Sequence, residues 1–201
     1  MHVIVDYGAG NIASILKACN DIEFNVVVSK NPEMIKNADS LILPGVGAFG
    51  AAMEQLNNTG LIPLIKEHVS LGKPFLGICL GMQLLYETSY EMGKFQGLGF
   101  LKGEVVPFKN TLKVPHMGWN QLTFNKPEHP ILSGIKEADY VYFVHSYYVK
   151  TKETDVVAYT PYGVDVPAIV AKNKVVGMQF HPEKSGTVGK ALLKAYKERM
   201  L

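Results

Sequence analysis

The segment around Cys79 places the strongest constraint on the fold of this chain. Apolar residues 75–78 lead into Gly77-Ile-Cys79-Leu-Gly81, and an amphipathic helical pattern begins directly behind them. A strand, a sharp turn and a helix in this order form a nucleophile elbow, which here carries a thiol at the turn. Glycines two residues before and after Cys79 allow the tight turn without a Cβ clash. The segment therefore predicts a buried strand that is followed at once by a helix.

The same geometry bears on the reactivity of Cys79. We expect the turn to lift its sulfur into a cleft at the first turn of the helix, where unpaired N–H groups and the helix dipole favour a thiolate. One thiol does not define a site, so a matching base must come from another part of the chain. The second cysteine, Cys19, occupies an apolar helical position and is predicted to be a buried core thiol.

Strand and helix patterns alternate through residues 1–90. Buried strands are predicted at residues 2–5, 25–28, 40–43 and 75–78. Helices are predicted behind them: the first has Asn11 as its N-cap, Asn31-Pro32 opens the second, and the others lie at about 48–57, 61–71 and 80–88. This alternation indicates a parallel sheet that is covered by helices.

The pattern changes from about residue 97 onward. Strands with turns between them are predicted at 99–108, 121–124, 140–149, 155–160, 168–171 and 174–180, before a final helix at 187–200. No linker, repeat or low-complexity segment interrupts the sequence. We therefore predict one α/β domain over residues 1–201, with a largely parallel central sheet flanked by helices and a partly antiparallel extension in the second half.

Composition argues against several classes of protein. The 201 residues are 47% hydrophobic and 19% charged, as in a globular domain. The formal net charge is only +2 and the basic residues are scattered, which argues against nucleic-acid binding. No signal peptide is expected, because residues 1–6 lack a basic n-region and are too short for an apolar h-region. No membrane span is expected, because the longest apolar stretch is broken by glycine and proline. Two cysteines make no disulfide framework, so a reducing, cytoplasmic setting is the default expectation.

Two glycine-rich segments follow predicted strands. Residues 8–13 formally match the dinucleotide-binding pattern, but that pattern needs an acidic residue at the end of the second strand, where this chain has Ser29 and Lys30. A tight turn is the better interpretation of this segment. Residues 44–47, Pro-Gly-Val-Gly, end another strand, and loops at the carboxyl ends of neighbouring parallel strands meet in one crevice. Two interpretations remain: the backbone N–H groups of this loop face Cys79, or its glycines only shape a turn.

A candidate base follows the last predicted strand. His181 and Glu183 are two residues apart on an extended segment, so both side chains project to the same side. Pro182 between them fixes its own φ and removes a competing donor. A carboxylate on one imidazole nitrogen would orient the ring and stabilise the imidazolium, which leaves the other nitrogen to deprotonate Cys79. The three side chains are a candidate Cys-His-Glu triad.

The remaining histidines do not predict a metal site. His116 and His145 invite a metal interpretation together with His181, but the three have no compact ligand spacing. We therefore expect no metal and no cofactor.

These motifs resemble a known family. The segments 77–83 and 181–183 are similar to the two signatures of class I (triad) glutamine amidotransferases, and the loop at 44–47 is similar to that family's glycine loop. Four further segments resemble the glutaminase subunits of imidazole glycerol phosphate synthase, an enzyme of histidine biosynthesis. They are Asp6-Tyr-Gly-Ala-Gly-Asn11, Pro115-His-Met-Gly-Trp-Asn120, Tyr142-Phe-Val-His-Ser-Tyr147 and Gln179-Phe-His-Pro-Glu-Lys-Ser-Gly186. The resemblance runs the whole length of the chain, in order.

The resemblance implies a reaction. The Cys79 thiolate would attack the side-chain amide carbon of glutamine, and His181 would protonate the leaving ammonia and then activate water to hydrolyse the thioester. The elbow places the backbone N–H of Leu80 as one oxyanion donor, and our hypothesis for the second donor is the N–H of Val46 or Gly47.

Contacts to substrate and partner also follow from the resemblance. It implies that Gln83 and the backbone around Ser146 and Tyr147 hold the amino-acid end of glutamine. It further implies a second chain, a (β/α)₈-barrel cyclase that receives the ammonia and forms imidazole glycerol phosphate. The residues expected to face that partner are Asn11, Trp119, Tyr142 and Lys184.

Other interpretations stay open on the sequence alone. Trp119 suits the centre of an interface, but it also suits a half-buried core position, and Lys184 or Gln83 suits an ordinary surface position. The chain is alternatively a glutaminase for another amidotransferase, a cysteine hydrolase that acts alone, or a non-catalytic module that has kept the fold. The segment 115–120 argues against the first of these, and the intact triad argues against the last.

Overall fold

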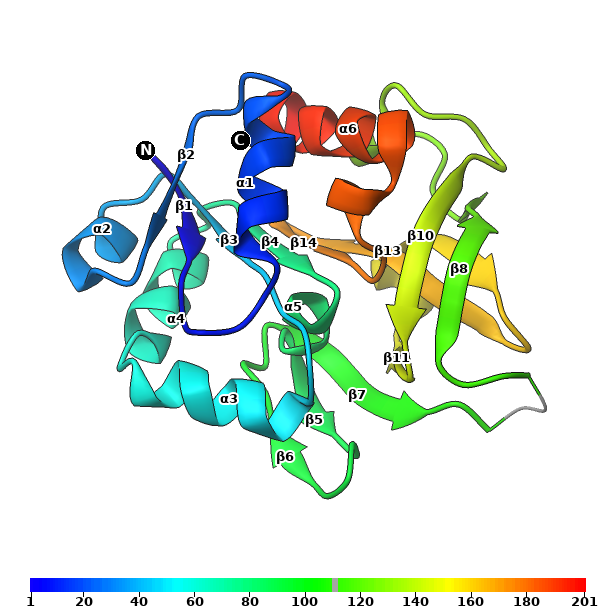
Figure 1. Cartoon of the computed structure of the whole chain (residues 1–201), viewed down its shortest axis with the longest axis horizontal. Helices are drawn as coiled ribbons and strands as arrows, with labels where there is room; N and C mark the ends of the chain where they lie inside the picture. The colour runs from blue at the N-terminus through cyan, green and yellow to red at the C-terminus, as the bar shows by residue number, and fades with distance from the viewer. Residues whose placement is uncertain (110–111) are drawn as a thin grey trace.

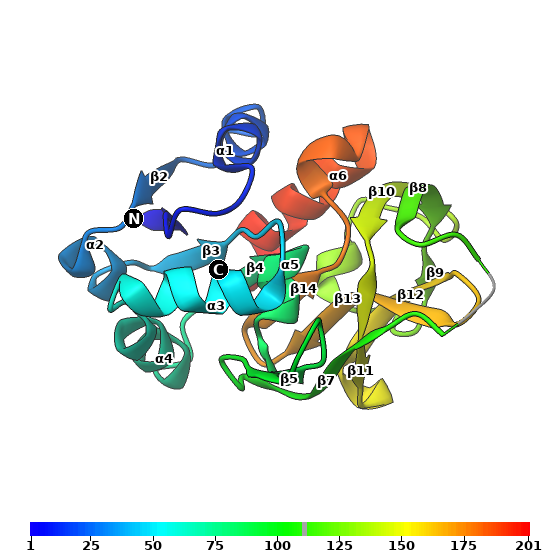
Figure 2. The same cartoon turned by 60° about the horizontal axis from the view of Figure 1, so that its bottom comes forward.

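A computed structural model describes residues 1–109 and 112–201 (Figures 1 and 2). In this part of the chain an eight-stranded sheet runs through the centre, in the order β2-β1-β3-β4-β14-β13-β12-β9. The strands from β2 to β14 pair in parallel, and β14, β13, β12 and β9 pair antiparallel. The predicted α/β class, with a parallel sheet and an antiparallel extension, is confirmed. The strands of this sheet are β1 (His2–Val5), β2 (Val26–Ser29), β3 (Ser40–Leu43), β4 (Phe75–Ile78), β9 (Thr123–Phe124), β12 (Val156–Pro161), β13 (Asp165–Lys172) and β14 (Val175–Met178).

Helices cover both faces of the parallel strands. Figure 2 shows α1 and α6 on one face and α3 and α4 on the other. Short 3-10 turns and one π turn complete the chain. The helices are α1 (Ile12–Asn20), α2 (Pro32–Lys36), α3 (Phe49–Asn58), α4 (Ile62–Ser70), α5 (Leu80–Gln83) and α6 (Gly186–Ala195), and the turns are η1 (Pro130–Leu132), η2 (Glu153–Asp155), η3 (Pro182–Lys184) and η4 (Tyr196–Met200).

The period-two alternation of the strands divides the core into two layers. Ile4, Ile42 and Leu76 point into the layer under α1 and α6. Their neighbours Val3 and Leu41 point into the opposite layer, under α3 and α4. Because both faces are covered, these strands read as continuous apolar runs in the sequence.

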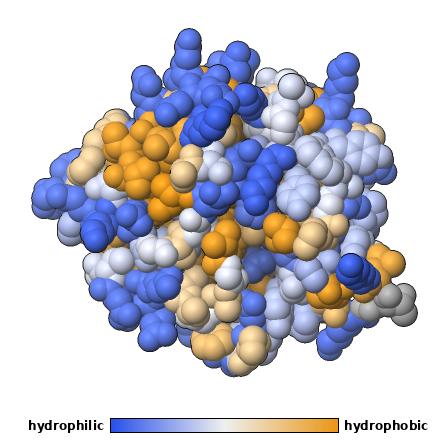
Figure 3. Space-filling view, viewed as in Figure 1, coloured by the Kyte–Doolittle hydropathy of each residue, from blue (hydrophilic) through white to orange (hydrophobic). Residues whose placement is uncertain are grey.

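Two smaller sheets flank the antiparallel end. One pairs β8 (His116–Gln121) with β10 (Tyr140–His145), and the other has the order β11-β7-β5-β6. In Figure 1 the β8–β10 pair stands on the opposite side of the molecule from β2. Figure 3 shows hydrophobic side chains gathered over the region of β1 and β2, where Val27 and Val28 are partly exposed on the edge strand. The strands of the second sheet are β5 (Tyr86–Ser89), β6 (Phe95–Gln96), β7 (Leu101–Pro107) and β11 (Tyr147–Thr151).

The helix predicted over residues 80–88 is wrong in its second half. Helix α5 ends at Gln83, and strand β5 begins at Tyr86. The carbonyls of Leu84 and Leu85 accept N–H groups of Leu98 and Leu101 (2.8 and 3.0 Å). Hydrogen bonds to a distant segment thus replace the helical ones, so tertiary pairing overrides the apolar helical pattern.

Three further differences are local. Residues 140–149 form two strands, because β10 pairs with β8 whereas β11 pairs with β7, and the chain passes between the sheets at Ser146. Strand β8 was not predicted as a strand. Asn11, the predicted N-cap, precedes α1 but its side chain makes no capping hydrogen bond. Helix α2 begins at Asn31-Pro32 as predicted, and the Asn31 side chain accepts from the N–H groups of Glu33 and Met34.

Candidate active site

Cys79 stands at a strained turn between β4 and α5. Its φ is 54° and its ψ is −113°, a region that side chains other than glycine seldom occupy. The Cys79 N–H donates to the Met178 carbonyl of the neighbouring strand β14 (2.7 Å), which helps to hold the turn. A Cβ on Gly81 would overlap the Leu43 carbonyl oxygen, so only glycine lets the helix start this close to β3. The elbow predicted from the sequence is present, although its helix has only one turn.

The Cys79 thiol is buried at the floor of a cavity. Its Sγ lies 3.9 Å from the carbonyl oxygen of Val144 and 4.0 Å from Nε2 of Gln179. Strand β4 lies between β3 and β14, so the loops after all three strands meet at its carboxyl end. The loop after β3 carries residues 44–47, and the segment after β14 carries His181.

His181 and Glu183 form a buried pair on the short turn η3. Nδ1 of His181 lies 2.7 Å from Oε1 of Glu183, and the two side chains are only 4% and 0% exposed. Burial lowers the pKa of His181, but hydrogen bonds to Cys79 and Glu183 outweigh it and raise this pKa to about 10. The Glu183 carboxylate thus favours the imidazolium form of His181, the form whose positive charge would stabilise negative charge that develops next to it.

The backbone of His181 is fixed from two sides. Its N–H donates to the Tyr142 carbonyl of β10 (3.0 Å), and its carbonyl accepts from Oγ of Ser185 (2.7 Å). The same Ser185 oxygen accepts the N–H of Tyr142 (3.0 Å). Strand β10 thus positions the imidazole, a contribution that the sequence motif does not reveal.

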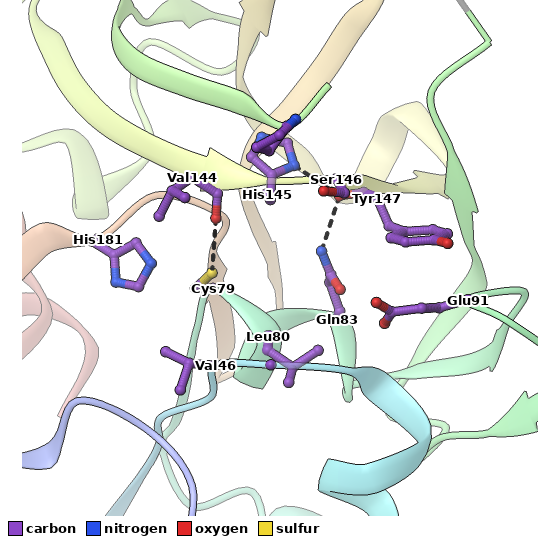
Figure 4. A pocket seen from close by; sticks show the side chains of 12 residues that line it. Val46, Cys79, Leu80, Gln83, Glu91, Val144, His145, Ser146, Tyr147 and His181 are labelled. Atoms are coloured by element: carbon purple, nitrogen blue, oxygen red, sulfur yellow. Dashed lines mark hydrogen bonds between the residues drawn. The ribbon is translucent and has the colours of Figure 1, made fainter. Parts of the chain in front are cut away.

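The cavity has a volume of about 320 Å³ and gathers most of the predicted substrate-site residues (Figure 4). In Figure 4, His181 and Glu91 lie on opposite sides of it, with Cys79 and Gln83 between them. The predicted residues in its wall are Val46, Gly47, Leu80, Gln83, Ser146 and Tyr147, together with Cys79 and His181.

Gln83 is a buried residue of this wall and not an ordinary surface position. Its Nε2 donates to the carbonyl of Tyr147 (3.0 Å) and to Oε1 of Gln179 (3.0 Å). The Gln83 side chain thus connects α5 with the start of β11 and the end of β14.

Four wall residues were not predicted from the sequence as part of the site: the apolar Pro115 and Val144, and the polar Glu91 and His145. Glu91 accepts the N–H of Phe49 at the start of α3 (2.7 Å), and burial raises the pKa of its carboxyl group. No local pattern marks Glu91, because only the pairing of β5 with β6 and β7 brings it to the cavity. His145 drew attention only as a metal ligand, yet it lines the cavity and donates to the carbonyl of Tyr147 (2.7 Å).

The residues predicted to face a partner lie at the surface around β8, β10 and η3. Trp119 is 52% exposed and pairs across the strands with Tyr142, their rings 6.0 Å apart. About half of the Trp119 surface is thus accessible, and the ring is not enclosed in the core. Lys184 is exposed, and Asn11 is partly buried at the start of α1, which packs against η3.

Residues 1–109 and 112–201 contain no group of three or more His, Cys, Asp or Glu side chains placed to hold a metal ion. None of the helices in these two ranges combines the length and the apolar character needed to cross a membrane. Cys19 is fully buried in the core, as predicted, and burial raises the pKa of its thiol to about 12.

Comparison with known proteins assigns this architecture to a class. Residues 3–196 match the family described as "Glutamine amidotransferase class-I". The chain belongs to the class I glutamine amidotransferases and is thus an enzyme of that class. Within the class it groups with proteins named "Imidazole glycerol phosphate synthase subunit HisH". The relative from Lactococcus lactis is 51% identical over 98% of both chains, and that from Aquifex aeolicus is 50% identical over 98% of this chain and 96% of its own.

Solved structures agree with the fold. A structure titled "Crystal structure of glutamine amidotransferase" superposes with a TM-score of 0.78 at 20% identity, covering 98% of each chain. The "Structure of PurLQS from Thermotoga maritima" superposes with a TM-score of 0.76 at 18% identity, covering 100% of this chain and 98% of the other. At these identities the likeness concerns the fold alone.

Proposed function

We propose that this chain hydrolyses glutamine to glutamate and ammonia through Cys79, His181 and Glu183, and that it supplies the ammonia to a cyclase subunit in histidine biosynthesis. The observation that carries the proposal is the buried 2.7 Å contact between His181 and Glu183, next to a thiol held in a strained elbow. The names of the 50%-identical relatives support the assignment of the cyclase as the partner.

The first half of the reaction forms a thioester. The sulfur of Cys79 attacks the amide carbon of glutamine, and the imidazolium of His181 donates a proton to the departing nitrogen, which leaves as ammonia. Glu183 stabilises the imidazolium and keeps Nε2 directed at the sulfur and the leaving group. In the second half, neutral His181 removes a proton from water, which hydrolyses the thioester and releases glutamate.

The tetrahedral intermediates need donors for their oxyanion. Leu80 is the first residue of helix α5, so its N–H has no intrahelical acceptor and is available as a donor. Val46 and Gly47 line the same cavity, with Val46 on the side of Leu80 and Cys79 in Figure 4, and we assign the second donor to this loop. Tyr7 supports that assignment, since its hydroxyl donates to the Pro44 carbonyl (2.9 Å) and so ties down the start of the loop.

The amino-acid end of glutamine fits the part of the cavity away from His181. There the backbone at Ser146 and Tyr147 and the Gln83 side chain supply polar groups. The carboxylate of Glu91 suits the substrate ammonium, whose charge would favour the ionised form of this carboxyl group.

The ammonia requires an acceptor site on a second chain. Strand β10 connects the proposed partner face to the triad, because Tyr142 contributes both its side chain to the pair with Trp119 and its carbonyl to the His181 N–H. We propose that the cyclase docks on this face, with Asn11 and Lys184 contributing at its rim, and forms imidazole glycerol phosphate and an aminoimidazole carboxamide ribonucleotide.

The test is ammonia release from glutamine, measured on the chain alone and together with the cyclase and its nucleotide. We expect strong stimulation by the pair, complete loss in Cys79→Ala, and retention in the matched control Cys19→Ala, which removes the other buried thiol. Absence of glutaminase activity in both states would contradict the proposal. High activity on esters or peptides without a partner would instead identify a cysteine hydrolase that acts alone.

A further inference from the structure

A chain of hydrogen bonds runs behind the cavity wall through two buried histidines. His116 on β8 and His145 on β10 are directly opposite one another, with Nδ1 of His116 2.9 Å from Nε2 of His145. Nδ1 of His145 lies 2.7 Å from the Tyr147 carbonyl oxygen, and Nε2 of His116 lies 2.9 Å from Oδ1 of Asn120. Three successive contacts thus join Asn120, His116, His145 and Tyr147, and Tyr147 lies in the cavity wall.

The number of N–H groups available for these three contacts determines in which direction the hydrogen bonds run. Three contacts need three N–H donors, while two neutral imidazoles carry one N–H each and the Tyr147 carbonyl can only accept. If the Asn120 amide oxygen also accepted, one ring would have to be a buried cation. Burial lowers the pKa of His145 to about 3 and also lowers that of His116. Both rings are therefore neutral, and the third N–H must come from Asn120, with its amide nitrogen turned toward His116.

We propose that Asn120, His116 and His145 are positioning residues that fix the substrate end of the cavity through a one-way chain of hydrogen bonds. Asn120 Nδ2–H donates to His116 Nε2, His116 Nδ1–H donates to His145 Nε2, and His145 Nδ1–H donates to the Tyr147 carbonyl. The effect on glutamine rests on the proposed function, whereas the tautomers of the two rings do not depend on it.

The position of the Tyr147 carbonyl needs support, because it lies where the chain changes from one sheet to the other. The chain leaves β10 and enters β11 at Ser146, so this stretch of backbone belongs fully to neither sheet. The same carbonyl accepts Nε2 of Gln83, so His145 and Gln83 hold it from two elements. On the other side of His145, the Val144 carbonyl faces the Cys79 sulfur. Loss of the His145 contact would loosen the wall against which the head of glutamine binds.

The ring of His116 is held so that its two nitrogens have fixed directions. It stacks between Phe143 (centroids 4.7 Å apart, planes at 17°) and Tyr162 (3.8 Å, 15°), with Phe108 edge-on at 6.4 Å. A phenyl ring would fill this stack equally well. The position uses the two nitrogens of histidine, one to receive a hydrogen bond and one to pass it on.

The far end of the chain lies beside the proposed partner face. Asn120 follows Trp119 on β8 and is partly exposed. With its nitrogen turned toward His116, its Oδ1 is directed away from the ring. The chain of hydrogen bonds therefore runs from the partly exposed end of β8, next to Trp119 in sequence, to the cavity wall through Asn120, His116 and His145.

The first test reads the tautomers directly. In protein labelled with ¹⁵N in its histidine rings, imidazole nitrogen shifts at neutral pH distinguish Nδ1–H, Nε2–H and imidazolium forms, and His116→Phe and His145→Asn assign the signals. We expect neutral Nδ1–H tautomers for both rings. An Nε2–H tautomer or an imidazolium at either residue would overturn the proposal. This measurement keeps its meaning even if the chain proves to have no glutaminase activity.

The second test is kinetic and is made on the chain in the presence of its cyclase partner. His145→Phe should raise KM for glutamine about tenfold while kcat changes less than about threefold, because one hydrogen bond to the binding wall is lost and the triad is untouched. His145→Asn, whose amide N–H can replace Nδ1–H, should recover most of the affinity, and His116→Phe should show a smaller rise in KM. His2→Phe, at the far end of strand β1, is the matched control.

Two kinetic results would contradict the positioning role. One is a His145→Asn protein with the same raised KM as His145→Phe, because the proposal attributes the effect to the N–H donor and not to the ring. The other is unchanged KM in a folded His145→Phe protein. A wild-type enzyme without glutaminase activity would instead refute the proposed function and leave the tautomer test to decide the chain of hydrogen bonds.

Discussion

Gly47 provides a sharp test of the oxyanion assignment, because the cost of substitution to stability and to catalysis can be separated. Its φ is +91°, and a Cβ built on it meets no atom within 4 Å. Gly47→Val therefore introduces backbone strain but no clash, at a cost of about 1–3 kcal/mol. For a chain of this length each kcal/mol lowers Tm by about 2–4 °C, so the variant should lose roughly 2–12 °C and remain folded at 25 °C.

The substitution should lower kcat by more than the loss of stability alone would explain. The variant relieves its strain by rotating the peptides on either side of residue 47, which turns the N–H of Val46 or Gly47 away from the oxyanion. Loss of one such donor costs about 3 kcal/mol in the barrier, or about 10²- to 10³-fold in kcat. Binding of glutamine should change little, because the residues assigned to its amino-acid end lie across the cavity.

The assay is ammonia release with the cyclase partner present, alongside thermal unfolding of the same preparations. Gly134→Val is the matched control, since Gly134 has φ +89° and its Cβ would make only an ordinary contact with Ala191 (3.8 Å). The control should lose similar stability and keep its activity. A folded Gly47→Val protein with kcat within about threefold of the control would refute the assignment of this loop as an oxyanion donor.

Three other expectations concern the triad, the elbow and the partner face. Glu183→Gln should lower kcat strongly, and it should also make the free energy of unfolding depend less on pH, which unfolding measured between about pH 6 and 10 will show. The reason is that the raised pKa of His181 contributes stability that is complete below pH 6.5 and is lost as the pH rises toward about 10. Gly81→Ala should abolish activity and lower Tm, since its Cβ would overlap the Leu43 carbonyl, and normal thermal unfolding would count against this. Trp119→Ala should weaken cyclase binding by about 2 kcal/mol or more in calorimetry, with basal activity of the isolated chain unchanged.

Features encoded over a few residues could be predicted from the sequence. The elbow at Cys79 follows from two glycines at fixed spacing, and the pair of His181 with Glu183 follows from the two-residue period of an extended segment. The alternation of strands and helices in the first half follows from apolar periodicity, because each strand is covered on both faces. These features depend on local geometry, which each short segment carries by itself.

Features that depend on distant pairing could not be predicted. The helix predicted to reach residue 88 ends at residue 83, and residues 86–89 form strand β5, because segment 97–101 takes the carbonyls of residues 84–87. Glu91 reaches the cavity only as a consequence of that pairing, and no residue near it in the sequence indicates its place. The division of residues 140–149 at Ser146 likewise arises because the two halves pair with different sheets.

Short segments of the sequence specify the reactive groups of this glutamine amidotransferase, a thiol in a tight turn and a histidine with its carboxylate, and they also specify the parallel strands that bring these groups to one edge. The surroundings of these groups depend on the folded chain. The wall of β10 and β11, the clamp on the Tyr147 carbonyl and the exposure of Trp119 all come from hydrogen bonds and packing between segments far apart in the chain. The physical reason is that a backbone turn is specified by its own few residues, whereas a binding wall is specified by partners that only the folded chain brings together.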